Sequence, residues 1–482
     1  MQLSRHKVVI IGAGIAGITA GLELLDRGFL PADIVILEAE DAVGGRAKSV
    51  ISSDGFLVNP GALWHHDRRG PYYRWLKARY GRHGKVEYQL APQVGSKRFK
   101  NIYDLDDLAG NSAIFAEGRR QYDLRSSGYS RLRRQHLIHQ HAHPGKDTTL
   151  AALASLDGSH DAWNYSRFKA CNWMGLDHEE VSAAEYFKEN GADGGLVVMG
   201  GTGRIPEQMI REFKARGGAV EMQTRVTVIG QTSGDVQVAT SKGKLFVADQ
   251  AIVTVPVALL KAGAIQFFPK PSNEVQGCLD RFVISQFGKV VVPLSQEFFE
   301  QRGIERNHQV DVFEQGPLVY CHAFSAGEPT ISIKGGGKFG GSYFAGELEN
   351  MSSWGRQRFI TRILEAVPEF RGFERFLCGE PYVSNWTQSA GGAWSALRLG
   401  EVRPKGPIRD GRVVFAGEAF TKTEYGASMM HGAWRSGKDA GTDVATEADD
   451  LSDYDVPMRE ENLVGPWLMA YRRSRAQARL LH

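Results

Sequence analysis

Three glycines near the N-terminus have the spacing of a dinucleotide-binding turn. Gly12, Gly14 and Gly17 follow Val8-Val9-Ile10-Ile11, an apolar run that predicts a buried strand, and they precede an Ala-, Gly- and Leu-rich helix predicted over 15–25. Glycines at these positions permit a tight turn, a close approach of the backbone to a pyrophosphate and close packing of helix on strand. The N-terminus of the helix then presents free amides to the anion.

An acidic residue and a second glycine pair complete this pattern. Glu38 ends a second predicted strand, 33–38, and lies 21 residues after Gly17, where a carboxylate can accept hydrogen bonds from a ribose diol. Gly44-Gly45-Arg46 follows, and its glycines allow the chain to pass close to a cofactor while the guanidinium can pair with a pyrophosphate. A nicotinamide enzyme does not need this second element, so the pattern favours FAD.

The segment from Val8 to Arg46 resembles the glutathione-reductase-like FAD-binding proteins, in particular the flavin-containing amine oxidase family. Similar segments cover 7–70 and 200–445, and three of them are specific: Thr254-Val255-Pro256 with Phe267-Phe268-Pro269, Phe415-Ala416-Gly417-Glu418, and His431-Gly432-Ala433 with Ser436-Gly437. The resemblance implies FAD, with Gly417 and Glu418 near the ribityl chain and Ala433 in a helix whose N-terminus faces the pyrimidine end. It also implies that the backbone at Val226 meets the adenine.

The same resemblance assigns four residues to the catalytic side. Lys289 aligns with the lysine that holds a water against flavin N5, and His66 matches a histidine that borders the substrate face of the flavin. Trp394 resembles one wall of the aromatic cage, whereas Met429 stands where the opposite aromatic wall is usual. Ala393 stands where family members with a covalently attached flavin have cysteine, so we expect noncovalent FAD.

The resemblance implies an FAD-dependent amine oxidase that uses O2 and acts on a small-molecule amine, either a polyamine, a monoamine or an amine in a biosynthetic intermediate. Two alternatives stay open. One is an L-amino-acid oxidase or flavin monooxygenase on the same fold, although the arginine that would bind a substrate carboxylate is missing from the pattern, with Arg68 and Arg69 nearby but out of place. The other is a non-catalytic flavin-binding interaction protein.

Composition excludes several other classes. A formal charge of +3 over 482 residues does not indicate nucleic acid or an anionic membrane as partner, and no apolar run approaches the roughly 20 residues of a spanning helix. The four cysteines are far apart, without Cys-x-x-Cys spacing, which favours a reducing compartment, and we expect a cytoplasmic protein. The sequence is compatible with a homodimer but does not indicate one.

An Arg- and His-rich segment, 117–146, is predicted to be a solvated excursion of the chain at the protein surface, because runs of charged residues are usually exposed. Its histidines lack cysteine or carboxylate companions at ligand spacing, so we assign no metal site.

The predicted fold is α/β, or α+β overall, with a glutathione-reductase-like Rossmann domain interleaved with a substrate domain of mixed sheet and helices. Further strands are expected over 219–229, 236–240 and 412–415, a pair of strand segments over 246–255, and helices over 354–367 and 430–444. The predicted FAD-binding domain comprises 1–80, 200–285 and 391–450, the substrate-binding domain comprises 81–199 and 286–390, and 451–482 is a C-terminal tail.

Overall fold

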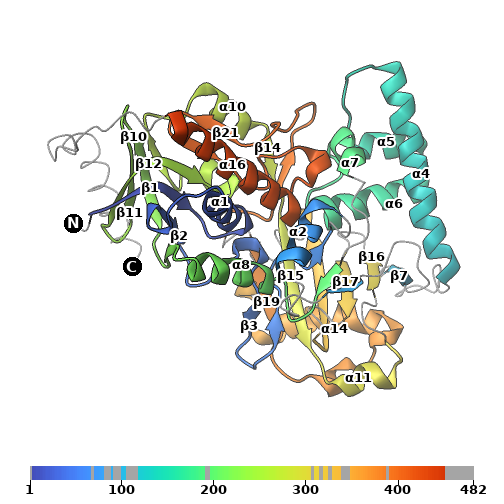
Figure 1. The fold of residues 1–482 in the computed structure, drawn as a ribbon. Helices are drawn as coiled ribbons and strands as arrows, with labels where there is room; N and C mark the ends of the chain where they lie inside the picture. The colour runs from blue at the N-terminus through green and yellow to red at the C-terminus, as the bar shows by residue number, and fades with distance from the viewer. Residues whose placement is uncertain are drawn as a thin grey trace. The chain divides into compact units, whose positions relative to one another are not determined.

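The structure is a computed structural model of the 482-residue chain. It describes residues 3–66, 70–80, 88–90, 99–104, 118–189, 196–304, 309–313, 319–323, 328–337, 348–386 and 390–450. The chain forms two compact units (Figure 1): unit 1 contains 1–48, 205–282 and the chain from 403 on, and unit 2 contains 49–204 and 283–402. By this division 49–80 and 391–402 belong to unit 2, whereas the predicted domains placed them with the FAD-binding segments. The predicted tail, 451–482, lies outside the described residues.

Unit 1 is built on a nine-stranded sheet with the order β13-β10-β11-β12-β1-β2-β9, to which β22 and β21 are joined beside β12. The first strand, β1, lies between β12 and β2 and is parallel to both. Its buried residues include Val8 to Ile11, which have apolar neighbours on both faces, as expected of a central parallel strand. The predicted strand, helix and strand at the N-terminus are therefore confirmed. The strands of this sheet are β1 (Leu3–Ile11), β2 (Ile34–Leu37), β9 (Ala219–Glu221), β10 (Val226–Gln231), β11 (Val236–Thr240), β12 (Leu245–Val253), β13 (Gln266–Phe268), β21 (Ile408–Asp410) and β22 (Val413–Phe415).

Two predicted strand regions are divided differently in the structure. The region 219–229 contains two strands, β9 and β10, separated by a turn in which Gln223 has a positive φ. Conversely, the predicted pair of segments over 246–255 is the single strand β12, because β1 pairs with it from Leu245 to Val253, while its first half also pairs with β11 and its second half with β22.

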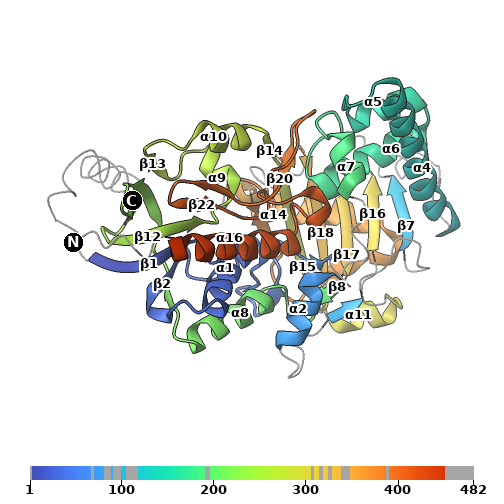
Figure 2. The same cartoon turned by 45° about the horizontal axis from the view of Figure 1, so that its top comes forward.

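Small residues allow two helices of unit 1 to pack closely. Helix α1 (Ile15–Asp26) and helix α16 (Met430–Asp450) lie side by side in both views (Figures 1 and 2). A Cβ on Gly437 would lie 2.1 Å from the Ala16 carbonyl oxygen, and one on Gly441 would lie 2.9 Å from the Ala20 oxygen. These glycines therefore set the separation of the two helices. The other helices of this unit are α8 (Arg204–Ala215), which begins at the unit boundary, α9 (Val257–Lys261) and α10 (Asn273–Asp280), with short turns η1 (Pro31–Asp33), η2 (Gly45–Ala47) and η9 (Thr423–Tyr425).

Unit 2 contains a six-stranded sheet with the order β19-β15-β18-β17-β16-β7. All neighbours are antiparallel except β16 and β7. Smaller sheets join β5, β8 and β6, β3 and β4, and β14 and β20. The strands of unit 2 are β3 (Val50–Ile51), β4 (Leu57–Val58), β5 (Trp64–His65), β6 (Tyr88–Leu90), β7 (Phe99–Asp104), β8 (Leu196–Val198), β14 (Phe282–Ile284), β15 (Phe287–Pro293), β16 (Gln309–Phe313), β17 (Val319–Ala323), β18 (Thr330–Gly336), β19 (Tyr382–Asn385) and β20 (Ser395–Leu397).

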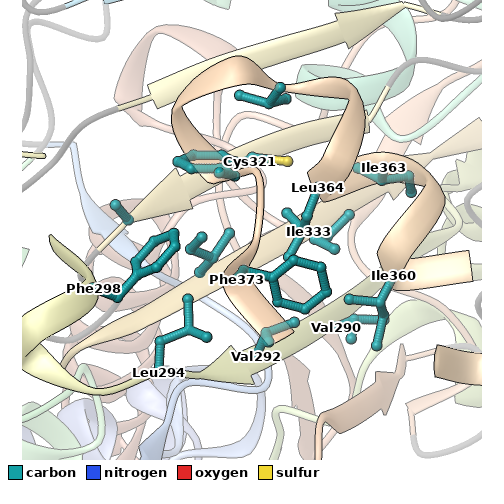
Figure 3. Close-up of a cluster of buried hydrophobic side chains, with 14 of the residues drawn as sticks. Val290, Val292, Leu294, Phe298, Cys321, Ile333, Ile360, Ile363, Leu364 and Phe373 are labelled. Carbon is teal, nitrogen blue, oxygen red and sulfur yellow. The ribbon is translucent and has the colours of Figure 1, made fainter. Parts of the chain in front are cut away.

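An apolar cluster covers one face of the six-stranded sheet (Figure 3). Val290 and Val292 of β15 and Ile333 of β18 pack against Ile360 and Leu364 of helix α14 (Ser353–Ala366). Because side chains alternate between the faces of a strand, Lys289 of β15 and Lys334 of β18 belong to the opposite face. The predicted helix over 354–367 is confirmed by α14.

Helices α4, α5, α6 and α7 form a second cluster in unit 2, in which Leu132, Leu150, Tyr165 and Tyr186 are buried together. Within the Arg- and His-rich segment, residues 118–142 form the helix α4, which buries Leu132 and His136 and leaves Arg131, Arg134 and His141 exposed. The remaining helices of unit 2 are α2 (Pro71–Tyr80), α4 (Gly118–Ala142), α5 (Leu150–Asp157), α6 (His160–Lys169), the π-helical turn η4 (Ala170–Met174), α7 (Ala183–Glu189), α11 (Gln296–Gln301), α13 (Leu348–Asn350), η7 (Pro368–Phe370) and η8 (Phe373–Phe376).

No helix in the part of the chain that the structure describes is long and apolar enough to cross a membrane.

Candidate functional site

The glycine turn of unit 1 joins the carboxyl end of β1 to the N-terminus of α1. Gly12 has a φ of +106°, and a Cβ there would lie 2.7 Å from Thr254 Oγ1, which itself donates to the carbonyl oxygens of Ile11 and Gly12. A Cβ on Gly17 would lie 1.9 Å from the Gly12 carbonyl oxygen, so only glycine fits there. Gly14 differs, because no atom lies within 4 Å of the position that a Cβ would take there. Two of the three glycines therefore shape the turn, and the third leaves open space.

Glu38 lies just after β2, beside the turn. Its Oε2 accepts a 2.7 Å hydrogen bond from the Ala13 amide, and its Oε1 accepts one of 2.9 Å from the Glu40 amide. Burial raises the pKa of the Glu38 carboxyl above its ordinary value, and the two amide donors oppose this. Each carboxylate oxygen has a further lone pair, so Glu38 keeps acceptor capacity for a ligand hydroxyl.

The second glycine pair packs directly on the first turn. The Gly44 amide donates to the Ala13 carbonyl at 2.8 Å, and Gly44 forms a parallel bridge with Gly14. Gly44 and Gly45 both have positive φ, +105° and +52°, which explains why both are glycines. Arg46 follows them, and its Nη1 lies 3.1 Å from Glu418 Oε1. The structure thus brings together two predicted cofactor residues separated by 372 positions.

Glu418 belongs to the turn that follows β22. Gly417 has a φ of +136°, has open space where a Cβ would be, and donates its amide to Ser436 Oγ of α16 at 3.0 Å. Met429 lies just before α16, and its carbonyl accepts from the Ala433 amide in the first turn of that helix. Val226 is buried at the start of β10. The contacts of Met429, Ala433 and Val226 with a cofactor stay predictions.

These residues fit a dinucleotide. Gly14 and Gly417, where a Cβ would meet open space, lie in glycine turns at the carboxyl ends of parallel strands, where α/β sheets bind such ligands. Helix α1 follows Gly14 without a side-chain cap and without an acidic residue in its first turn, so nothing in its own first turn competes with an anion. Glu38 and Arg46 supply an acceptor and a cation beside the same turn.

In unit 2 the structure buries Lys289 completely, at 1% exposure. Its Nζ donates to the carbonyl oxygens of Asn59 and Gly61 at 2.5 and 2.7 Å. The intervening Pro60 carbonyl accepts from Trp386 Nε1 at 2.6 Å and from Ser384 Oγ at 3.1 Å. The chain before Trp64 is therefore fixed on the sheet through its carbonyl groups.

Burial lowers the pKa of the Lys289 ammonium from 10.5 to about 7. The neutral amine has two hydrogens, both of which it can donate to the Asn59 and Gly61 carbonyls, so its lone pair stays available. The protonated amine has a third N–H instead. Lys289 therefore accepts or donates one further hydrogen bond according to its protonation, with the change near pH 7.

A second buried lysine lies beside Lys289. Lys334 of β18 is its cross-strand partner, and its Nζ lies 5.7 Å from the ring centroid of Trp64. Burial lowers the pKa of Lys334 well below its ordinary value, and the neighbouring charge of Lys289 lowers it further, against a smaller opposing effect of Cys321. Both lysines therefore hold their protons less tightly than an exposed lysine does.

Linkage between Lys289 and folding gives a test of this burial. The unfolded chain binds a proton on Lys289 up to about pH 10.5 that the folded chain releases near pH 7, so the free energy of unfolding rises with pH across this window. We expect the free energy of unfolding of Lys289→Met to rise less steeply with pH than that of wild type, by about 1.4 kcal/mol per pH unit, because one titrating proton is lost. Denaturant titrations at several pH values between 7 and 10 measure both slopes. Parallel pH dependences of wild type and variant would contradict the buried, deprotonated lysine.

Other aromatic side chains contact the two remaining predicted residues of unit 2, Trp394 and His66. The Trp394 backbone pairs with Ser285 just before β15, and its ring lies 5.1 Å from that of Phe287, two residues before Lys289. The predicted residue His66 lies 5.6 Å, centroid to centroid, from Trp173 in η4. Ala393 is buried beside Trp394, with no sulfur at that position.

Three contributors were not predicted from the sequence: Lys334, Trp173 and the carbonyls of Asn59 and Gly61. The alternation in Thr330 to Lys334 marks Lys334 as facing away from Ile331 and Ile333, so a signal for it existed. The carbonyl acceptors of Asn59 and Gly61 and the π-helical turn that carries Trp173 have no such pattern in the sequence.

For the remaining candidate residues the structure gives the following. Tyr425, four residues before Met429, is exposed, with Lys422 and Arg435 over its ring. Arg68 and Arg69 lie outside the described residues. Within the described ranges, no group of three or more His, Cys, Asp or Glu side chains could hold a metal ion.

Comparisons with known proteins agree with this geometry. The family model described as flavin containing amine oxidoreductase matches residues 15–445. Polyamine oxidase 2 of Arabidopsis thaliana is 25% identical over 92% of this chain and 89% of its own length. Polyamine oxidase 4 of Oryza sativa subsp. japonica is 23% identical over 90% of this chain and 87% of its own.

Solved structures share the fold. Cyclohexylamine oxidase from Brevibacterium oxydans IH-35A has a TM-score of 0.68 at 18% identity, covering 92% of this chain and 99% of that one. Wild-type putrescine oxidase bound to putrescine has a TM-score of 0.68 at 16% identity, covering 92% and 100%. The predicted fold class is thereby confirmed. With the family matched over most of its length, the chain belongs to the flavin-containing amine oxidoreductases and is a flavin amine oxidase.

Proposed function

We propose that this protein binds FAD noncovalently and oxidises a small-molecule amine to an imine with O2 as the final acceptor. When bound, the flavin supplies hydride acceptance at N5 from the Cα–H of the amine and passes the electrons to O2, which gives H2O2. The open positions at Gly14 and Gly417, with Glu38 and Arg46 beside them, support the FAD site. Ala393 supports noncovalent binding, because no cysteine is available at that position.

The observation that carries the catalytic part of the proposal is the burial of Lys289. Burial of an amine is costly, and perturbed groups of this kind concentrate at functional sites. We propose that the position left on Lys289 Nζ after its two carbonyl contacts holds a water, which serves reoxidation or imine hydrolysis. Trp394 and His66 are proposed to border the substrate, and Met429 to supply a soft apolar wall.

The reducing compartment is also a proposal, with the cytoplasm as its simplest form. All four cysteines are free thiols: Cys171, Cys278 and Cys321 are buried, and Cys378 is exposed. Burial raises the pKa of the Cys171 and Cys321 thiols to about 12, so these side chains are kept as unreactive thiols.

Anaerobic mixing with a panel of amines and amino acids tests the proposal. We expect the flavin absorption near about 450 nm to bleach with amines, and one equivalent of H2O2 to form per turnover when O2 is admitted. Bleaching by free amino acids alone would replace the amine substrate class with the amino-acid oxidase alternative. A flavin that no substrate bleaches, together with a protein partner that co-purifies, would favour the binding-protein alternative.

Attachment of the cofactor is tested separately. Acid precipitation of the purified protein should leave the yellow colour in the supernatant, and a coloured pellet would contradict noncovalent binding.

A further inference from the structure

A π-helical turn, η4, follows α6 in unit 2. Such turns are rare and occur often at functional sites. The turn ends at Gly175, which has a φ of +65°, and a Cβ there would lie 3.2 Å from Trp394 Cζ2 and 2.8 Å from Ser285 Cβ. The turn is therefore packed directly against the segment that carries the predicted substrate-side tryptophan.

Trp173 lies in this turn, two residues before Gly175. Its ring and that of His66 have centroids 5.6 Å apart at an interplanar angle of 59°. Trp173 is half-buried, so part of its ring stays accessible. Trp173 thus contacts one predicted site residue, His66, and belongs to a turn that packs against another, Trp394, within one unit.

A protein cation already occupies the ring of Trp173. Lys169 Nζ lies 4.5 Å from the Trp173 ring centroid, and 5.8 and 6.0 Å from those of Tyr165 and Phe168. Tryptophan is the aromatic side chain that attracts cations most strongly. An ammonium group of a ligand that approached the same ring would meet the like charge of Lys169.

Neighbouring charges on this segment have contacts of their own. Glu179 Oε1 lies 3.2 Å from His178 Nε2, and the charges of Arg167 and Asp177 also act on His178. Among the described residues, Lys169 places its ammonium group over the Trp173 ring.

We infer that Lys169, acting through Trp173, is a specificity-determining residue that disfavours substrates with a second, distal ammonium group. The substrate class is then amines with a single cationic nitrogen and an apolar remainder. This inference rests on the proposed amine oxidation and deepens it. It also departs from the activity in the names of the plant relatives, so one substrate pair can overturn it.

The experiment compares hexylamine with hexamethylenediamine, which share a carbon chain and differ in the distal ammonium. We expect wild-type holoenzyme to have a kcat/KM for the monoamine about tenfold above that for the diamine. In Lys169→Met the diamine value should rise about tenfold, chiefly through KM, while the monoamine value changes little. Lys169→Arg keeps the cation and should keep the discrimination.

Controls separate specificity from folding. Lys77→Met removes an exposed lysine of α2 in the same unit and should leave the substrate ratio unchanged. Where Lys169→Met does not retain FAD, Lys169→Gln measures the same ratio.

Two outcomes would overturn the inference alone: a wild-type enzyme that prefers the diamine, or a ratio that removal of the Lys169 charge leaves unchanged. If neither of these amines nor any amine of the wider panel reduces the flavin of the holoenzyme, the proposed function is overturned as well.

Discussion

Replacement of Gly14 by alanine should give a folded protein that binds FAD about a hundredfold more weakly than wild type. The protein itself leaves room for the new methyl group, because no atom lies within 4 Å of the position that the alanine Cβ would take and the Gly14 φ of −77° suits alanine. In the proposed FAD site, this space is the path by which the pyrophosphate approaches the backbone. Reconstitution of apoprotein with FAD, followed by fluorescence, measures the affinity, and circular dichroism measures the fold.

Gly17→Ala provides the matched control. The same methyl group would lie 1.9 Å from the Gly12 carbonyl oxygen, so we expect loss of thermal stability as well as of FAD. If Gly14→Ala bound FAD as wild type does, the pyrophosphate would not lie over this turn.

Lys289→Met should slow reoxidation of the reduced enzyme by O2 about a hundredfold, with a smaller effect on anaerobic reduction by amine. In the role proposed for Lys289, its ammonium form stabilises the negative charge that develops on oxygen as it is reduced. Because burial lowers its pKa to about 7, the wild-type reoxidation rate should fall as pH rises through this value. Stopped-flow mixing of reduced enzyme with O2 at several pH values measures both effects.

Anaerobic reduction of the same variant is the internal control, because a general loss of structure would slow both half-reactions. A reoxidation rate that keeps its pH dependence after Lys289→Met would assign the ionisation to another group, with Lys334 as the first candidate.

Local sequence order made the glycine turn predictable. Gly12, Gly14 and Gly17 lie within one strand, turn and helix, so their spacing indicated the turn, although the contact of Gly12 with Thr254 was not predicted. Contacts between distant segments are different. The ion pair of Arg46 with Glu418 joins residues 372 positions apart, and neither was expected to pair with the other.

Lys289 shows where sequence reasoning stops. The resemblance identified the residue, but when buried its Nζ donates to the backbone carbonyls of Asn59 and Gly61, and no side chain of these residues takes part in the contact. Carbonyl acceptors are present in every residue, so their type carries no signal. The helix over 118–142 was not predicted for another reason: its many charges indicated only solvation, although Leu132 and His136 recur at the spacing of a buried helical stripe.

The joining of β22 to β12 and of α16 to α1 has a consequence for biosynthesis. The ribosome makes α1 first, yet the strand and helix that complete its surroundings are encoded more than 380 residues later. The nascent chain must therefore keep an apolar helix and sheet edge incomplete until residues 413–450 have been made, a period in which chaperones protect such surfaces.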